Sequence, residues 1–177
     1  MGAITTKSSP QAHHVVVLGV PGAGRKTLAR ALLQQLPFTT AEPCVPFMEV
    51  LTAATSNLRV TTWSVGGSDR MKPLWPTWAE GATCIVLAVD AAGGSERMEL
   101  ARSELASLGK MEWASGLPLV VIATKADEPG ALSAGGVEVA CGAALWGQED
   151  VRRWTSLPFS ATAGDVDSVL KAVTGSY

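Results

Sequence analysis

The sequence has few charged residues and no long apolar run, and both absences limit the classes of protein to which it can belong. Only 17% of the 177 residues are charged, the formal net charge is -2, and the 14 basic residues are scattered along the chain. Nucleic-acid-binding proteins usually carry a concentrated basic patch, so this class is disfavoured. The longest apolar run, around CIVLAV, is far shorter than the ~20 residues that a membrane-spanning helix needs. No secretory signal is recognised, and we expect a soluble or peripherally attached protein.

Cysteine is also scarce. The three cysteines, Cys44, Cys84 and Cys141, are odd in number and widely spaced. This pattern suits neither a disulfide framework nor a zinc site, and it fits a reducing compartment. We therefore expect three independent thiols in a cytoplasmic protein.

The length and the apolar content support a single hydrophobic core. With 47% hydrophobic residues, the chain is long enough for one sizeable core and too short for a second independent domain. We predict a flexible N-terminal tail over residues 1–12 and one globular domain over residues 13–177.

Apolar, β-branched runs typical of buried strands alternate with helical patterns. The runs that predict strands are residues 13–19, 58–65, 83–90, 117–124 and 157–162. The apolar positions that predict three helices are Leu28, Leu32, Leu33 and Leu36; Met98, Ala101, Leu105 and Leu108 after Ser95 and Glu96; and Val166, Val169, Leu170 and Val173 after a capping Asp165. Such alternation predicts an α/β fold: a three-layer, doubly wound, mostly parallel sheet.

A glycine-rich loop, GVPGAGRKT, lies between the first predicted strand and the first predicted helix. In a P-loop, G-x-x-x-x-G-K-[ST], backbone N–H groups surround phosphate, the lysine reaches the outer phosphates and the hydroxyl binds Mg²⁺. Counted from Gly19, the lysine position holds Arg25 and the hydroxyl position holds Lys26; sliding the pattern by one residue would put Val20 and Arg25 at glycine positions. The candidate phosphate-binding residues are Gly19, Gly22, Ala23, Gly24, Arg25, Lys26 and Thr27.

A second motif carries a family resemblance over nearly the whole chain. WSVGGSDRMKPLW, residues 63–75, resembles the W-D-V-G-G-Q-D-x-x-R-P-L-W of Arf and Arf-like small G proteins. TKAD, residues 124–127, is similar to the N-K-x-D of that family, and SAT, residues 160–162, falls where its second base-contacting loop lies. The resemblance implies the small-GTPase fold of P-loop NTPases, with GTP or GDP as the bound nucleotide.

The two short motifs predict a guanine site. An ionised carboxylate can accept both N–H donors on one edge of guanine, so Asp127 suits recognition of this base. Lys125 would lay its aliphatic stem along the base, and the N–H of Ala161 could donate to the guanine oxygen. With Thr124 and Ser160 these residues form the candidate guanine site; alone, TKAD would more often be an ordinary turn after a strand.

Compared with the family pattern, the parts that bind Mg²⁺ and position water are altered. Cys44 stands where a threonine would close on the metal, and a thiol is a poor ligand for hard Mg²⁺. Ser64 replaces a metal-anchoring aspartate, and Ser68 replaces the water-positioning glutamine, which makes Ser68 the catalytic candidate. Thr27 is the remaining candidate for a metal hydroxyl, so Mg²⁺ is poorly supported. Gly67 keeps the position whose N–H would meet the γ-phosphate.

Three aromatic residues, Phe47, Trp63 and Trp78, fall where the family carries an exposed hydrophobic triad beside its switches. Aromatic side chains are common interface anchors. The resemblance therefore implies docking of effector and regulatory proteins at this face, against the alternative of core packing.

The N-terminus MGAITT matches the pattern for myristoylation at Gly2. The alternative is a frayed polar tail. One acyl chain supports only marginal, reversible attachment, so we expect transient peripheral contact with intracellular membranes.

Together these patterns predict an Arf-like, monomeric G protein that binds guanine nucleotide, hydrolyses GTP weakly and recruits effectors through its switch face, in membrane traffic or signalling. The alternative is a pseudo-GTPase, in which the same fold serves as a nucleotide-independent protein-binding module. An unrelated P-loop enzyme such as a small kinase is disfavoured, because the sequence offers no candidate acceptor-site acid or lid.

Overall fold

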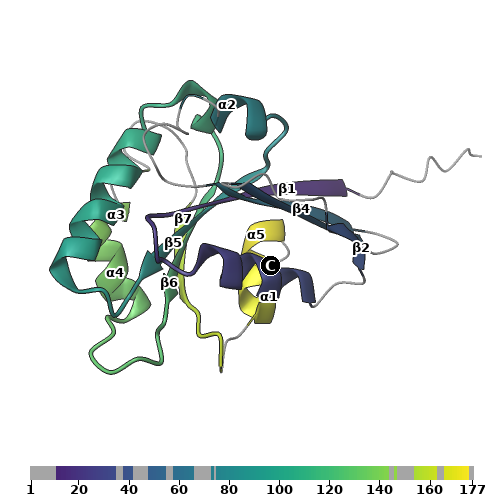
Figure 1. Cartoon of the computed structure of the whole chain (residues 1–177). Coiled ribbons are helices and arrows are strands. Elements are labelled where there is room, and N and C mark those ends of the chain that lie inside the picture. The colour runs from purple at the N-terminus through teal and green to yellow at the C-terminus, as the bar shows by residue number, and fades with distance from the viewer. Residues whose placement is uncertain are drawn as a thin grey trace, which may run out of the picture.

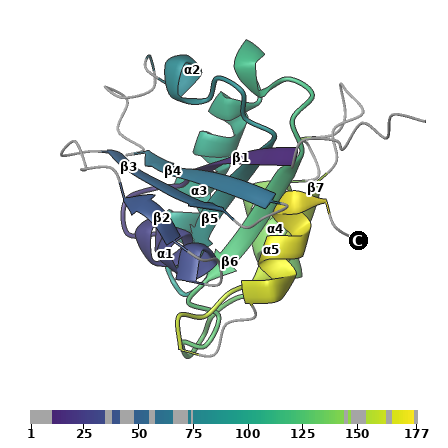
Figure 2. The same cartoon turned by 90° about the vertical axis from the view of Figure 1, so that its right-hand side faces the viewer.

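A sheet of seven strands lies at the centre of the computed structural model, counted over the described residues, 11–34, 38–41, 48–54, 58–65, 73, 75–143, 146, 154–162 and 166–175 (Figure 1). The strands are β1 (Gln11–Leu18), β2 (Phe38–Ala41), β3 (Met48–Ala54), β4 (Leu58–Val65), β5 (Cys84–Asp90), β6 (Leu119–Thr124) and β7 (Trp154–Pro158). Their order is β2-β3-β4-β1-β5-β6-β7. Pairing is parallel from β4 through β7, whereas β2 and β3 add an antiparallel edge beside β4 (Figure 2).

Helices cover both faces of this sheet (Figures 1 and 2). They are α1 (Arg25–Gln34), α2 (Trp75–Trp78), α3 (Gly94–Leu108), α4 (Ala134–Cys141) and α5 (Val166–Thr174), with a short 3₁₀ helix, η2 (Glu112–Ala114). One apolar cluster joins α2, α3 and α4 to the sheet, and a second joins α1 and α5 to its other face. Within the described part of the chain, no helix is both long and apolar enough to cross a bilayer.

Two interior strands, β5 and β6, are buried along their whole length. Their side chains alternate between the faces: Ile85, Leu87 and Val89 join the cluster under α3 and α4, whereas Val86 and Ala88 join the cluster under α1 and α5. A parallel strand covered by helices on both sides needs apolar residues at every position. This explains the unbroken apolar runs in the sequence and confirms the predicted three-layer α/β fold.

The predicted helical stripes of α1 and α3 are buried where the structure describes them, and in α5 Val169 and Val173 are buried whereas Val166 and Leu170 are partly buried. Leu28, Leu32 and Leu33 of α1 are at most 2% exposed, and the four predicted α3 positions are at most 5% exposed.

Several boundaries differ from the predictions. Strand β1 begins at Gln11, inside the predicted tail, and β5 and β6 begin at Cys84 and Leu119. Helix α3 begins at Gly94 and its N-cap is Gly93, without a side-chain cap. The last strand ends at Pro158, because the chain turns at residues 161 and 162.

Sequence patterns missed the short elements β2, β3, α2 and α4. Helix α4 starts with Ala134, Gly135 and Gly136, and glycine is a poor helix former. Its ends are instead fixed by caps: the Ser133 side chain accepts from the Gly136 N–H, and Gly142 adopts a left-handed φ of 72°. Leu36 and Asp165, assigned to helices from the sequence, lie outside the described residues.

Candidate functional site

Four parallel strands, β1, β5, β6 and β7, end at the same edge of the sheet, here called the carboxyl edge. The register pairs Leu18 with Leu87, and Asp90 with Thr124. Backbone hydrogen bonds tie the following loops together, since the Ala91 N–H donates to the Thr124 carbonyl at 2.9 Å. The glycine loop and the TKAD and SAT motifs all follow these strands, as expected for a ligand site in a doubly wound sheet.

The glycine loop, residues 19–24, follows β1 in a conformation that demands glycine. A Cβ placed on Gly19 would lie 2.3 Å from the Ala88 carbonyl oxygen of β5, and Gly19 has a φ of +143°. Gly22 and Gly24 have φ of +84° and +74°. These left-handed values let the loop turn tightly back toward the start of α1.

The glycine loop runs directly into α1. The Leu28 N–H donates to the Gly24 carbonyl at 2.9 Å, which is a helical bond of the first turn. N–H groups at a helix start point outward along the axis and carry a partial positive charge. The glycine loop and the first turn of α1, together called the phosphate end, therefore form an arrangement suited to an anion.

The side chains at the start of α1 differ in their surroundings. Arg25 is half-buried, whereas Lys26 and Thr27 are exposed. Burial lowers the pKa of the Arg25 guanidinium, and attraction to the buried Glu104 of α3 opposes that shift. Arg25 therefore has an acidic neighbour inside the protein, while Lys26 and Thr27 face solvent.

Thr124 connects the glycine loop to the neighbouring strands. Its side chain is 2% exposed, and its Oγ1 lies 3.0 Å from the carbonyl oxygens of Ala23 and of Val89. A hydroxyl has one proton to donate, so it alternates between these acceptors or is shared by them. Thr124 thus joins the TKAD motif to the glycine loop across the carboxyl edge.

Lys125 follows with a φ of +55°, a left-handed value that is uncommon for residues with side chains. Its Nζ lies 2.5 Å from Oδ2 of Asp90, the last residue of β5. The other Asp90 carboxylate oxygen, Oδ1, accepts the Ala92 N–H at 3.1 Å. Because Asp90 is buried, this ion pair directs Lys125 along the end of β5.

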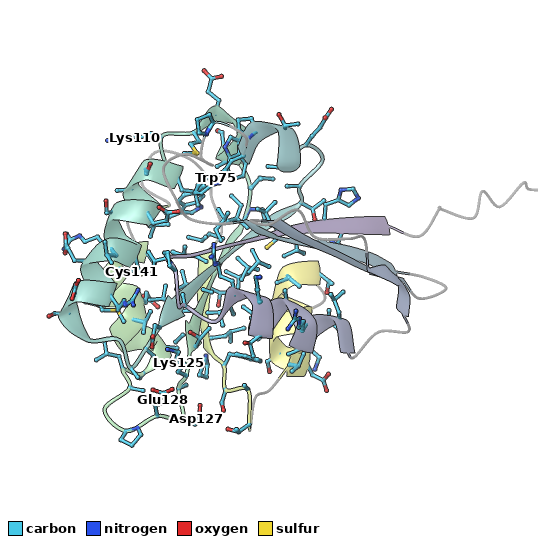
Figure 3. The ribbon with its side chains drawn as sticks, viewed as in Figure 1. Trp75, Lys110, Lys125, Asp127, Glu128 and Cys141 are labelled. Carbon is cyan, nitrogen blue, oxygen red and sulfur yellow. The ribbon has the colours of Figure 1, made fainter. Side chains whose placement is uncertain are left out.

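Asp127 is exposed at the same edge, close to Lys125 (Figure 3). The Thr162 hydroxyl donates to Asp127 Oδ2 at 2.8 Å, and the Thr162 and Ser160 hydroxyls lie 2.8 Å apart. Hydrogen bonds from the Ser160 and Thr162 side chains, in that order, lower the pKa of the Asp127 carboxyl group. The carboxylate is therefore ionised at neutral pH and oriented by the SAT motif.

The two motifs that carry the base prediction, residues 124–127 and 160–162, are together called the base end. The Phe159 N–H donates to the Ala123 carbonyl at 2.8 Å, and the Ala126 N–H donates to the Phe159 carbonyl at 3.3 Å. The backbone thereby brings both motifs side by side. Ser160 is buried under this edge, whereas Ala161 is exposed.

The remaining candidates from the sequence are only partly covered by the structure. Gly2, Cys44, Phe47, Gly67 and Ser68 lie outside the described residues. The backbone places Trp63 and Ser64 in β4, and Trp78 at the end of α2. The predicted hydrophobic triad and the predicted catalytic residue stay predictions.

Two site residues were missed by sequence reasoning. Thr162 belongs to the quoted SAT motif, but its hydroxyl was given no role. Asp90 ends an otherwise apolar, fully buried strand, and a charge at the end of such a strand is the signal that could have identified it. Both residues act through partners distant in the sequence, 35 residues away in each case.

Comparison with known proteins shows the family of the chain. The sequence model of the ADP-ribosylation factor family matches residues 3–170. The chain belongs to this family. Mouse ADP-ribosylation factor-like protein 14 is 35% identical over 136 residues, which cover 76% of this chain and 70% of that protein. Mouse ADP-ribosylation factor-like protein 4D is 37% identical over 136 residues, 72% of this chain and 65% of that protein.

A yeast relative and a solved structure extend the comparison. Yeast ADP-ribosylation factor-like protein 1 (Saccharomyces cerevisiae) is 32% identical over 151 residues, 85% of this chain and 79% of that protein. Among solved structures, the Arl6 BBS3 small GTPase from Trypanosoma brucei, bound to the nucleotide analogue GppNp, superimposes with a TM-score of 0.76. The superposition covers 94% of this chain and 97% of the other at 18% identity, so it establishes the small-GTPase fold.

Proposed function

We propose that this Arf-family protein binds guanine nucleotide across the carboxyl edge, with the base at the base end and the phosphates at the phosphate end. The single observation that carries the proposal is the Thr124 hydrogen bond to the Ala23 carbonyl. Because this contact joins the two ends, one ligand of nucleotide size would meet both.

Recognition of guanine rests on the Asp127 carboxylate. Its pKa is lowered by the Ser160 and Thr162 hydroxyls, so it stays ionised and can accept two N–H donors from the base. The exposed Ala161 lies in the same motif, and its N–H would meet the guanine oxygen. Adenine presents a different donor and acceptor pattern, so we expect it to be rejected.

Binding of the phosphates relies on backbone more than on side chains. The glycine loop and the start of α1 supply N–H donors and a positive partial charge. Lys26 is exposed beside them and offers a cation, while Arg25 is attracted by Glu104. Weak GTP hydrolysis is the expected result, since Ser68 replaces the residue that would orient water.

The residues at the phosphate end do not fit Mg²⁺ well. Arg25 and Lys26 occupy the two positions where a P-loop carries its lysine and its metal-binding hydroxyl, and two cations repel a divalent ion. Thr27 supplies one hard oxygen ligand. We therefore assign no step to the metal.

The output of the protein, in this proposal, is recruitment of effector and regulatory proteins through the face that carries Phe47, Trp63 and Trp78, in membrane traffic or signalling. Residues 13–177 act as one G-protein domain and as a monomer, in the cytoplasm. Gly2, when acylated, gives transient contact with membranes, because a single chain binds them weakly. Equal acyl labelling of wild type and Gly2→Ala would show that Gly2 is not the site of acylation.

The experiment that tests the proposal measures the guanine nucleotide retained by purified protein, with and without EDTA. We expect the protein to retain GDP or GTP. EDTA should change the retained amount little, because the residues that would bind Mg²⁺ are replaced. Small GTPases that hold Mg²⁺ through intact ligands serve as the comparison and should lose nucleotide in EDTA.

The proposal would be contradicted if the purified protein retained no guanine nucleotide and bound none when it was added, under every condition. That result would favour the pseudo-GTPase, a nucleotide-independent binding module on the same fold. The half-buried position of Arg25 and the buried carboxylate of Glu104 favour this second candidate, because an internal carboxylate would compete with phosphate for the cation at the lysine position.

A further inference from the structure

An arginine that the sequence patterns did not single out contacts the glycine loop from outside. Arg97 belongs to the first turns of α3, and its Nη1 donates to the Pro21 carbonyl oxygen at 2.7 Å. This is a short, charge-assisted hydrogen bond between residues 76 apart in the sequence. The contact lies on a different element from every residue proposed above to bind the nucleotide.

The guanidinium of Arg97 also lies beside the next residue of the loop. A Cβ placed on Gly22 would be 3.7 Å from Nη2, 3.8 Å from Nη1 and 3.9 Å from Cζ of Arg97. These are ordinary contact distances, so the positive group lies next to the Gly22 backbone. A cation at this distance favours a negatively charged ligand at the glycine loop.

Peptide geometry links this contact to phosphate binding. The Pro21 carbonyl and the Gly22 N–H belong to one peptide group, and the described residues contain no cis peptide bond. In a trans peptide the carbonyl and the N–H point in opposite directions. By holding the Pro21 carbonyl toward α3, Arg97 turns the Gly22 N–H away from α3.

The chain makes room for this arginine at Gly93. A Cβ on Gly93 would lie 2.6 Å from Arg97 Cβ and 2.5 Å from Arg97 Cγ, distances too short for any side chain. Gly93 has an ordinary φ of -75°, so glycine is needed here for space and not for backbone conformation. Glycine at this N-cap, where Ser, Thr, Asp or Asn would stabilise the helix better, allows the Arg97 stem to reach the glycine loop.

We infer that Arg97 is a positioning residue of the nucleotide site, which fixes the Gly22 N–H as a phosphate donor and adds a positive charge behind it. The inference rests on the proposed function. It assigns to α3 a part of phosphate binding in a protein that carries Arg25 and Lys26 at the usual lysine and hydroxyl positions.

The test compares GDP and GMP affinities of nucleotide-free wild type, Arg97→Ala, Arg97→Lys and Arg102→Ala, by displacement of a fluorescent GDP analogue. Arg102 is exposed on the same helix and serves as the matched control. Loss of a charge-assisted bond should weaken GDP binding about ten-fold in Arg97→Ala. GMP lacks the outer phosphate and should change less than about two-fold, and Arg97→Lys should recover most of the GDP affinity.

The outcomes separate this inference from the proposed function. Unchanged GDP affinity in Arg97→Ala, or an equal loss for GDP and GMP, overturns the role of Arg97 and leaves guanine binding intact. Failure of wild type to bind either nucleotide overturns the proposed function and this inference with it. Should Arg97→Ala not fold, Arg97→Gln carries the same comparison, with a selective loss of GDP affinity expected.

Discussion

The base end and the phosphate end of the candidate site are built in different ways. At the base end, side chains of Asp127, Ser160 and Thr162 bond to one another. At the phosphate end the glycine loop is shaped by backbone conformation and by the close approach of Gly19 to β5. Side chains from other elements, Thr124 and Arg97, then contact its carbonyl groups.

This difference determines which positions of the site tolerate substitution. A phosphate site made of backbone N–H groups tolerates changes at Arg25 and Lys26, because their amides remain whatever the side chain is. A base site made of a single carboxylate does not tolerate loss of that group. The family pattern is accordingly kept at Asp127 and altered at the start of α1.

The largest effect is expected from Gly19→Ala, which breaks the phosphate end through its backbone. The added Cβ would meet the Ala88 carbonyl oxygen at 2.3 Å, at a φ of +143°. We expect the free energy of unfolding to fall by about 3 kcal/mol or more, from clash and strain together. Urea unfolding measures it. Gly116→Ala is the control, because Gly116 has a φ of +72° with nothing within 4 Å, and should cost about 1 kcal/mol. Equal losses of unfolding free energy in the two variants would show that a side chain at Gly19 does not clash with the Ala88 carbonyl.

Asp127→Asn should break the base end while leaving the fold intact. An amide accepts only one of the two guanine N–H donors and opposes the other with its own N–H group. We expect GDP affinity to fall about 100-fold, as two charge-assisted hydrogen bonds are lost. Glu128→Gln, at the exposed neighbouring residue (Figure 3), should leave affinity unchanged. Titration calorimetry measures the GDP affinity of both variants. Similar GDP affinities for Asp127→Asn and Glu128→Gln would count against the base end.

Thr124→Val tests the connection between the two ends. Valine has nearly the same shape but no hydroxyl, so the buried Ala23 carbonyl loses a donor. The free energy of unfolding should fall by about 1 to 2 kcal/mol, and GDP affinity several-fold. Thr174→Val near the end of α5, where a hydroxyl bonds the Leu170 carbonyl, is a control expected to change stability without changing affinity. A Thr124 variant with wild-type affinity would show that the ends act independently.

The smallest effect concerns the pKa of Asp127. Because the Ser160 and Thr162 hydroxyls lower that pKa below the ordinary 3.8, the ionised carboxylate contributes stability that is fully present above the unfolded-state value. That contribution is lost as the pH falls through the lower folded-state pKa. Thr162→Val should raise the pKa toward its ordinary value, as followed by NMR titration of the carboxyl carbon. An unchanged pKa would mean that Thr162 does not orient Asp127.

Local patterns in the sequence predicted the central fold and most of the site, but not the contacts that assemble it. Apolar runs predicted β5 and β6, because a strand covered on both faces leaves no alternative at any position. The glycine loop and Asp127 were found through motifs. The Lys125 ion pair with Asp90 and the Arg97 bond to Pro21 join residues 35 and 76 apart. No local periodicity encodes such pairs. Helix α4 was not predicted either, because its sequence has no helical pattern of apolar residues and its ends are fixed by caps.

The central claim is tested most directly by titrating GDP, and separately ADP, into nucleotide-stripped wild-type protein by calorimetry. The carboxylate of Asp127 at the base end, joined through Thr124 to the glycine loop, predicts binding of GDP and at least about 100-fold weaker binding of ADP. Equal affinity for the two nucleotides, or binding of neither, would contradict the account.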